Sequence, residues 1–423
     1  MISEIKNADR KVWCLFIFVI VLQIFILILA NPIQCMNDAV SYVRLAKYAA
    51  EVGSIYPTEK DIYSVYLFAP GYVNWLTMFF SLGFQEKAAL ASNIFFNAMI
   101  YWEIYYIGVK FWHRQTAMVS VLLFSISITT YASMLCLLTE IMFTALAGLV
   151  ICLSFSGNKK QMLIGGIILG LANWIRPLGI LYFVGIFIMK YLQIANIRHM
   201  KMMLAGFIGT AFIIGSVTYI HCGYFAFQSS TSGVNLIGSA NDYARGNTST
   251  GFKILQEGEM GYIPNDSMTF KEKDRYWRDL ALKWIAEHPD KWLGLMPVKL
   301  ARLYGVDVGF LDTFTGKDGV IENPNYIMNI VNDFPKLDML QTITLYNLII
   351  YYFVLLLFFI SAVQVIKKHD KGGMVLWVFW ILGTLITLPF PCSSRYHFPY
   401  MMMVFLLAGM MLTRKSNNEK SFD

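Results

Sequence analysis

The stretch WCLFIFVIVLQIFILILA, residues 13–30, is the segment that most clearly indicates the class of this protein. Its 18 residues include no charged side chain, and a helix needs roughly 20 mostly apolar residues to cross a bilayer. A basic segment precedes the stretch, and no small-residue cleavage site follows it. We therefore expect a retained first membrane helix here and not a cleaved signal peptide.

Outward from this segment, similar apolar runs recur along the whole chain of 423 residues. The sequence is 57% hydrophobic and only 14% charged, whereas soluble domains contain about 25% charged residues. Each run is expected to be helical, because backbone polar groups in lipid have to be satisfied within the segment. The sequence thus predicts an all-α polytopic membrane protein. The ten expected spans are residues 13–30, 88–109, 116–136, 140–156, 161–175, 178–193, 202–221, 341–366, 372–391 and 398–413.

The net charge of +7 is carried between the apolar runs. Lys and Arg are concentrated in the loops that we expect to be cytoplasmic, as the positive-inside rule requires. No basic patch is interleaved with aromatic residues, which argues against nucleic-acid binding. None of the six cysteines forms a CxxC pair, so we expect neither a disulfide framework nor a structural zinc site.

One further apolar stretch, residues 67–84 (LFAPGYVNWLTMFFSLGF), is long enough to cross a membrane. Pro70 and Gly71 interrupt its start, and Asn74 and Thr77 interrupt its apolar surface. If the stretch crossed the bilayer, most of the basic loops would move to the outside. We therefore predict an amphipathic, juxtamembrane or re-entrant segment, with both chain termini in the cytoplasm.

This topology divides the chain into three parts. Residues 1–221 are expected to form an N-terminal transmembrane module that includes the first outward loop at residues 31–87. Residues 222–340 form a sizeable extracytoplasmic loop, and residues 341–423 form the C-terminal transmembrane helices and a short cytoplasmic tail. Long structured loops usually have a function, so we expect the two outward loops to build the site.

The first outward loop contains an acidic residue, Asp38, a few positions beyond the first span. Tyr42 follows four residues later and shares a face with Asp38 if the segment is helical. One interpretation is that Asp38 is a helix N-cap, a position that Asp favours. The other is a partly desolvated carboxylate at the membrane surface, which can act as a general base.

A second carboxylate, Glu140, follows Thr139 at the start of the fourth expected span. In one interpretation it interacts with the helix dipole in the first turn. In the other it is functional, because carboxylates amid apolar membrane residues are costly. The predicted topology places Glu140 on the same side as Asp38.

Two arginines are expected on that same side. Arg176 lies between two spans, and Arg395 precedes the last span, followed by Tyr396. Either arginine could be a membrane-boundary residue whose charged end reaches water. A guanidinium also suits phosphate oxygens. Together with two carboxylates, the arginines predict a site for an anionic lipid headgroup that reacts beside a base.

In their order along the chain, these residues resemble the motifs of the GT-C superfamily of membrane glycosyltransferases. The most similar branch contains the bacterial protein O-mannosyltransferases and lipid A aminoarabinose transferases. The family often has two carboxylates at its first acidic site, whereas this chain has Asn37 and Asp38. The matching positions are Asp38, Tyr42, Ala46 and Gly53; Ala69 to Tyr72; Thr139 and Glu140; Gly170 to Pro177; residues 235–247; His288 and Pro289; and Arg395 to Pro399.

The resemblance implies transfer of a hexosyl or pentosyl unit from a polyprenyl-phosphate carrier to a hydroxyl of a glycan, lipid or protein. It implies that Asp38 is the catalytic base and that Glu140 positions the acceptor or helps to bind a divalent metal ion. Arg176 and Arg395 would bind the phosphate, with Tyr42 and Tyr396 beside the substrate.

The expected location is a bacterial inner membrane, with the site facing outside. Two other classes remain open on the sequence alone. One is a polytopic transporter or flippase, although we find no internal repeat of the kind that transporters often show. The other is a glycan polymerase or ligase, which has a similar layout.

Overall fold

The computed structural model describes residues 10–30, 34, 36–58, 61, 67–194, 199–247, 249–264, 267–317 and 319–413. Within these ranges the chain forms helices and no β-strand. The expected tail at residues 414–423 and parts of the first outward loop lie outside them. The helices are α2 (Arg10–Leu29), α3 (Asn37–Glu51), α4 (Pro70–Ser81), α5 (Glu86–Phe111), α6 (Arg114–Ile126), α7 (Ile128–Met134), α8 (Thr139–Ser154), α9 (Lys159–Ile175), α10 (Gly179–Tyr191), α11 (Met200–Cys222), α12 (Ser232–Ser239), η2 (Thr250–Leu255), α13 (Phe270–Glu287), α14 (Pro289–Gly294), α15 (Met296–Tyr304), η3 (Leu311–Phe314), α16 (Pro324–Asp333), α17 (Met339–Lys367), α18 (Lys371–Thr387), η4 (Ser394–His397) and α19 (Phe398–Thr413).

Each of the ten expected spans contains helical structure, but the number of membrane crossings is not settled by length alone. Among the described residues, four segments are long and apolar enough to cross: Arg10–Leu29, Met200–Cys222, Met339–Lys367 and Ser394–Thr413. A fifth arises if α6 and α7 are counted as one broken span. The predicted count of about ten therefore stays a prediction. The apolar α8, α10 and α18 are shorter helices.

The expected straight span at residues 116–136 is instead bent by 63° between α6 and α7. Ser127 adopts an extended conformation at the break. Side chains replace the lost backbone bonds: Thr130 donates to the carbonyl of Phe124, and Tyr131 donates to that of Ser125. Such substitution is what allows a membrane helix to break without leaving its carbonyls unsatisfied.

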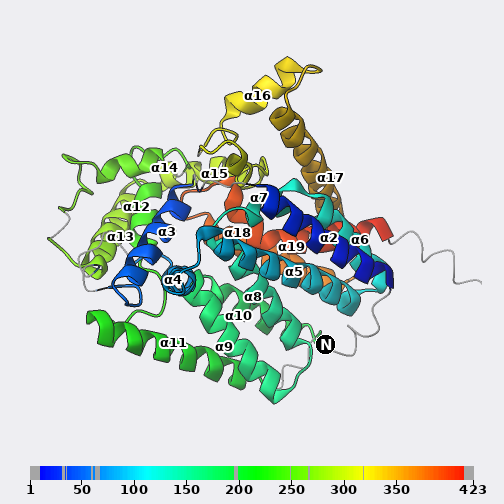
Figure 1. The fold of residues 1–423 in the computed structure, drawn as a ribbon, viewed down its shortest axis with the longest axis horizontal. Coiled ribbons are helices and arrows are strands. Elements are labelled where there is room, and N and C mark those ends of the chain that lie inside the picture. Colours follow the sequence, from blue (N-terminus) through cyan, green and yellow to red (C-terminus); the bar gives the residue numbers. More distant parts are fainter. Residues whose placement is uncertain are drawn as a thin grey trace, which may run out of the picture.

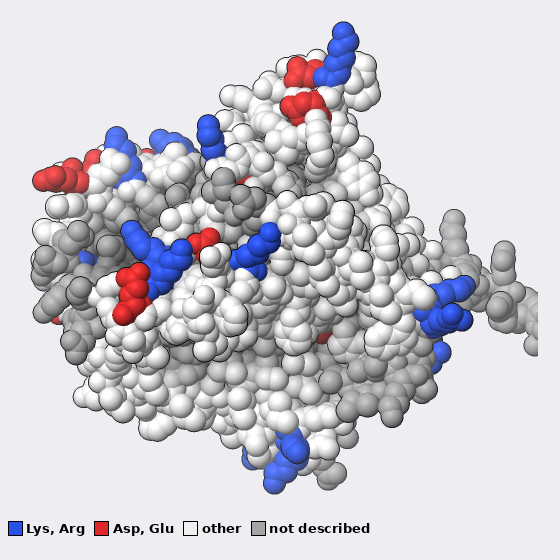
Figure 2. Space-filling model, viewed as in Figure 1, with Lys and Arg blue, Asp and Glu red and all other residues white. Residues whose placement is uncertain are grey.

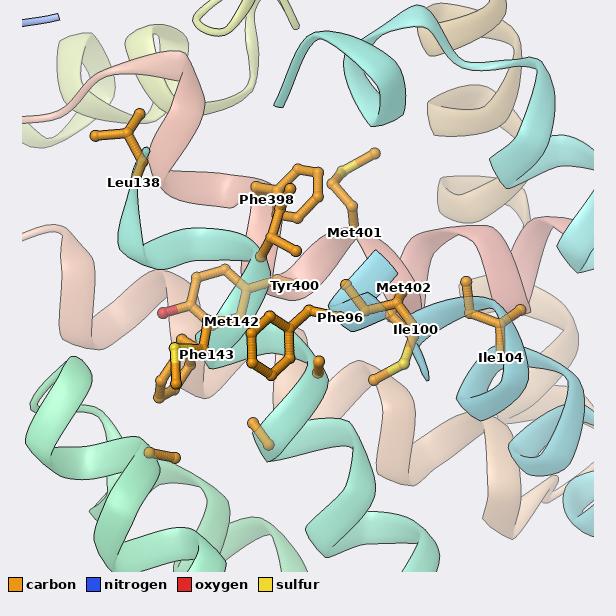
Figure 3. Close-up of a cluster of buried hydrophobic side chains, with 14 of the residues drawn as sticks. Phe96, Ile100, Ile104, Leu138, Met142, Phe143, Phe398, Tyr400, Met401 and Met402 are labelled. Carbon is orange, nitrogen blue, oxygen red and sulfur yellow. The ribbon is translucent and has the colours of Figure 1, made fainter. Parts of the chain in front are cut away.

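The bundle is held together by a large apolar core between α5, α8 and α19 (Figure 3). The last helix, α19, is buried over nearly its whole length, with 83% of its apolar window inside the protein. By contrast, α2, α11 and α17 are only 22–28% buried over their windows and turn most of their apolar side chains outward. The outer helices are therefore those suited to face lipid. Labelled core residues in Figure 3 are Phe96, Ile100, Ile104, Leu138, Met142, Phe143, Phe398, Tyr400, Met401 and Met402.

Glycines allow α9 and α11 to approach closely. A methyl group at Gly166 would lie 2.0 Å from the carbonyl oxygen of Met203, and one at Gly206 would lie 2.4 Å from that of Leu163. Small residues at such crossings are typical of helix pairs in membranes, where packing and not water exclusion drives association.

The stretch at residues 67–84 forms the short helix α4, which begins at Pro70 and has 12 residues. It is too short to cross a bilayer by itself, in agreement with the predicted juxtamembrane segment. Gly71 lies against the backbone of Trp174 and Ile175, where a methyl group would meet atoms at 2.8–2.9 Å. This close approach brings α4, and α3 packed on it, to the end of α9.

The first part of the second outward segment forms a cluster at one end of the molecule, whereas α16 lies away from it, beside α17 (Figure 1). Helices α12, α13 and α14 lie together there, beside α3, around their own apolar residues Val234, Ile237, Ile254, Trp277 and Ala281. The start of α2 and the end of α19 lie at the opposite end of the bundle (Figure 1). Figure 2 shows a broad surface almost free of charged side chains between these two ends.

Candidate functional site

Asp38 lies in the first turn of α3, and Met36 is the residue at the N-cap position. The side chain of Met36 makes no capping hydrogen bond. The interpretation of Asp38 as an N-cap is therefore wrong. The carboxylate of Asp38 instead accepts a hydrogen bond from Nη2 of Arg395, which comes from the η4 turn at the far end of the sequence.

Glu140 and Arg176 form a second carboxylate–arginine pair. Glu140 lies in the first turn of α8, and its Oε1 is 2.8 Å from Nη1 of Arg176, which directly follows α9. The same guanidinium nitrogen donates to the hydroxyl of Thr139 at 3.2 Å. The glutamate is thus a first-turn acid, as the first interpretation predicts, and an ion-pair partner of Arg176; its functional role stays a prediction.

Tyr396 joins the two pairs. The guanidinium carbon of Arg176 lies 5.5 Å from the centre of its ring, and that of Arg395 lies 5.1 Å from it. Cations at such distances are attracted by the ring electrons. Arg395 also donates to the Tyr396 hydroxyl at 3.4 Å. The structure therefore brings both arginines and both carboxylates to one place.

Tyr42 completes this group from one turn further along α3. Its ring packs against Phe68 at 4.6 Å and Tyr72 at 5.5 Å between centres. Burial, together with the nearby carboxylates of Asp38 and Glu140, raises the pKa of the Tyr42 phenol well above its usual range. The phenol is consequently neutral and can donate a hydrogen bond at physiological pH.

One donor of the site has no partner. Nη1 of Arg395 is buried and makes no hydrogen bond within the part of the chain that the structure describes. Buried donors are costly unless they are satisfied. The Arg395 side chain is only 13% exposed, so the surrounding residues fix its orientation. Its Nη1 is therefore already oriented to donate to an anionic oxygen that enters the site.

The charges in the site balance: two carboxylates face two guanidiniums. No group of three or more His, Cys, Asp or Glu residues that could hold a metal ion occurs among the described residues. Each candidate carboxylate is already in contact with an arginine. In each pair the arginine contacts one carboxylate oxygen, and the expected divalent metal ion at these residues stays a prediction.

Sequence reasoning noted His397 within the Arg395–Pro399 motif but did not identify the acidic residues that hold the arginine segment. Oε1 of Glu322 accepts hydrogen bonds from the hydroxyls of Ser393 and Ser394 and from the Ser394 amide, at 2.7–2.9 Å. His397 faces Asp307, with 3.1 Å between Nε2 and Oδ1. The only sequence signal was indirect: acidic residues placed within a long outward loop.

No protein-family model matches the chain, and no curated protein matches it by sequence. Its structure, however, superposes over 98% of its length on the oligosaccharyltransferase of Archaeoglobus fulgidus in the apo form, with a TM-score of 0.50 and 13% identity. The same TM-score and identity relate it to that enzyme tethered to an acceptor peptide containing the NVT sequon. That enzyme is a GT-C glycosyltransferase. This chain has the GT-C fold.

The GT-C fold and the apolar helices make the chain an integral membrane protein. The chain spans about half the length of the archaeal oligosaccharyltransferase, 52% and 51% in the two structures. At 13% identity the likeness concerns the fold. The chemistry of this chain has to be argued from its own site.

Proposed function

We propose that the chain is a glycosyltransferase that moves a sugar from a polyprenyl-phosphate-linked donor to an acceptor hydroxyl. The observation that supports this most directly is the meeting of Asp38 and Arg395 beside the Glu140–Arg176 pair, with one buried arginine donor unpartnered. A base and a phosphate-binding guanidinium in contact are the two groups that such a transfer needs.

In the proposed reaction, the acceptor oxygen forms a bond to the anomeric carbon of the sugar. The bond from that carbon to the phosphate oxygen breaks, and its electron pair leaves with the polyprenyl phosphate. The acceptor proton passes to the carboxylate of Asp38. The family resemblance implies inversion at the anomeric carbon.

Arg395 has to change partners for this reaction. Its Nη2 contacts Asp38, while Nη1 has no hydrogen-bond partner among the residues that the structure describes. A donor phosphate bound at Nη1 would compete with Asp38 for the guanidinium and so free the carboxylate for the acceptor hydroxyl. Phosphate binding would in this way activate the base only when the donor is present.

Arg176 is the second phosphate contact in this proposal, and Glu140 acts by holding it. The carboxylate of Glu140 is 3% exposed and already bonded to Arg176, which leaves it little opportunity to reach an acceptor. Tyr396 keeps the two guanidiniums on either side of one ring, and Tyr42 is a neutral donor beside Asp38.

The proposed setting is the outer face of a bacterial inner membrane. The distribution of basic loops in the sequence supports this orientation, and it places both pairs on the outside. The acceptor is a hydroxyl of a glycan, lipid or protein. The archaeal enzyme has been solved tethered to an acceptor peptide, which supports a peptide or protein among these acceptors.

The test is transfer by the purified protein in lipid nanodiscs. Polyprenyl-phosphate hexose and pentose donors are supplied, and release of polyprenyl phosphate is followed by mass spectrometry. Mass spectrometry of envelope glycans and glycoproteins, from cells with and without this chain, identifies the acceptor. Unchanged envelope glycans, together with no turnover of any polyprenyl-phosphate sugar, would contradict the proposal.

A further inference from the structure

An open groove lies in the outward cluster, where the turns between α12 and α13 meet η2. Its volume is about 470 Å³, which suits a ligand of the size of a mono- or disaccharide. None of its lining residues belongs to the two carboxylate–arginine pairs. The chemistry proposed above does not use this groove.

The groove is positively charged. Arg245 and Lys253 line it, and no carboxylate is among the described residues of its wall. The neighbouring carboxylate of Asp242 is already paired with Lys291 at 3.2 Å. The Lys253 ammonium lies 4.6 Å from the centre of the Tyr243 ring, whose face attracts a cation. The wall therefore favours an anionic ligand.

Arg245 has donors that are still available. Its Nη1 donates to the backbone carbonyls of Asp242 and Ala244, at 3.0 and 2.8 Å. The other nitrogens of this guanidinium make no hydrogen bond within the part of the chain that the structure describes. Because the two backbone bonds restrain the guanidinium, its remaining edge is oriented for the paired oxygens of an acidic group.

The rest of the wall suits a sugar ring. Tyr243 and Phe252 supply aromatic surface, against which the C–H face of a sugar can pack. Ser249, Thr250 and Gln256 supply hydroxyl and amide groups, which can hydrogen-bond to sugar hydroxyls. Cations, aromatic rings and small polar groups in one groove match a saccharide that also has a negative charge.

The shape of the groove is fixed by hydrogen bonds around it. The side-chain amide of Asn241 donates to the carbonyls of Ile237 in α12 and Gly251 in η2, at 2.5 and 2.9 Å. The Tyr243 hydroxyl donates to Glu259 at 2.7 Å, which holds its ring in place. A preformed site loses less conformational entropy on binding than one that has to be ordered by its ligand.

The groove is also attached to the segment that contains Arg395. Gly246, which adjoins the groove, accepts a hydrogen bond from the amide of Cys392 at 3.0 Å, three residues before that arginine. Lys299 lies against the same turn, 3.3 Å from where a methyl group at Gly246 would be, and donates to the carbonyl of Leu388 at 3.0 Å. A ligand in the groove is therefore held at a defined position relative to the proposed phosphate contact.

We propose that this groove binds an acidic saccharide unit, and that this unit is part of the acceptor. The inference rests on the proposed function, because it assumes that the chain transfers a sugar to an acceptor. Arg245 and Lys253 bind the acidic group, while the aromatic and small polar side chains bind the sugar ring. The groove thereby selects acidic glycans over neutral ones.

The test is saccharide binding by the full chain in nanodiscs of neutral phospholipid, without donor, followed by ligand-observed NMR titration. The probe is a disaccharide of glucuronate and N-acetylglucosamine, and its carboxyl-reduced form is the neutral control. The variant Arg245→Gln/Lys253→Gln removes both cations of the groove. The matched variant Lys271→Gln/Arg275→Gln removes two cations of α13 that do not line the groove.

We expect the wild type and the α13 variant to bind the acidic disaccharide about tenfold or more tightly than the neutral one, since bonds to charged groups are the stronger ones. The groove variant, at matched thermal stability, should lose this preference. Equal wild-type affinity for both disaccharides, or an unchanged preference in the groove variant, would overturn the inference. Inorganic phosphate that binds as tightly as the acidic disaccharide would also overturn it, because the groove would then recognise any small anion.

Turnover of polyprenyl-phosphate sugars by the same preparation separates this inference from the proposed function. Donor turnover without preference for the acidic disaccharide would contradict the inference alone. Preferential binding of the acidic disaccharide without turnover of any donor would contradict the proposed function, and with it the assignment of the saccharide as acceptor.

Discussion

The Asp38–Arg395 and Glu140–Arg176 pairs contain the same two chemical groups in different settings. Glu140 and Arg176 lie on consecutive helices, and their side chains are 3% and 19% exposed. Asp38 and Arg395 are 357 positions apart in the sequence, and the Asp38 side chain is 31% exposed. One pair is buried between packed helices, and the other joins an outward helix to a short turn.

In the reaction that we propose, this difference distinguishes a pair that holds the structure from a pair that takes part in the chemistry. A buried charge that loses its partner is strongly destabilising, because water cannot replace the partner. A carboxylate that is partly exposed loses far less when its partner moves away. We therefore expect Asp38 to exchange Arg395 for substrate groups during turnover, and Glu140 to stay bound to Arg176 throughout.

The largest expected effect is at Asp38. Asp38→Asn keeps a carbonyl oxygen that can accept from Arg395 but cannot take up a proton. Since a positioned base contributes about 100- to 10,000-fold, we expect kcat to fall by about that factor while donor binding and thermal stability stay near normal. Transfer assays with purified protein at matched concentration measure this. Near-normal transfer by the variant would remove Asp38 as the base.

The next largest effect is on stability, at the buried pair. Glu140→Gln leaves Arg176 without a counter-charge, and breaking a buried pair costs about 3–5 kcal/mol. The double variant Glu140→Gln/Arg176→Met should recover part of this free energy of unfolding, because no charge is left unpaired. Denaturation in detergent gives both values. A Glu140→Gln protein that is fully stable but inactive would instead make Glu140 a participant in the chemistry.

A smaller effect is expected on donor affinity. Arg395→Ala removes hydrogen bonds to a charged phosphate, worth about 1.5–3 kcal/mol, so the donor KM should rise about ten- to a hundredfold. Arg395→Lys keeps the charge without the forked donor geometry and serves as the matched control, with an intermediate KM. Unchanged donor KM in the alanine variant would place the phosphate elsewhere.

The smallest effect is expected at Tyr42. Tyr42→Phe removes the neutral hydrogen bond that the phenol would donate to the substrate, worth about 1 kcal/mol, so kcat/KM should fall about fivefold. Because the pKa of the phenol is raised, Tyr42 stays protonated through the ordinary alkaline range and adds no titration of its own. The pH profiles of variant and wild type should thus be parallel up to pH 9. A profile whose alkaline side disappears in the variant would show that Tyr42 ionises.

The sequence predicted the helical class and the residues that meet in the site. The apolar runs located the long helices, because a membrane segment has to satisfy its backbone polar groups within itself. The ordered motifs predicted one site made of six residues, and the structure brings these six residues together: Asp38, Tyr42, Glu140, Arg176, Arg395 and Tyr396. The bend after Ile126 was missed, because its compensating hydrogen bonds from Thr130 and Tyr131 leave no periodic signal.

The sequence by itself determined that this chain is a helical membrane protein with acidic and basic residues near the ends of its apolar runs, since composition and spacing follow directly from the properties of the bilayer. Only the tertiary structure decided which carboxylate meets which arginine. Asp38 is nearer in sequence to Arg176, yet it pairs with Arg395. That choice depends on how α3, η4 and the ends of α8 and α9 pack, and long-range packing between helices is not encoded in any local pattern.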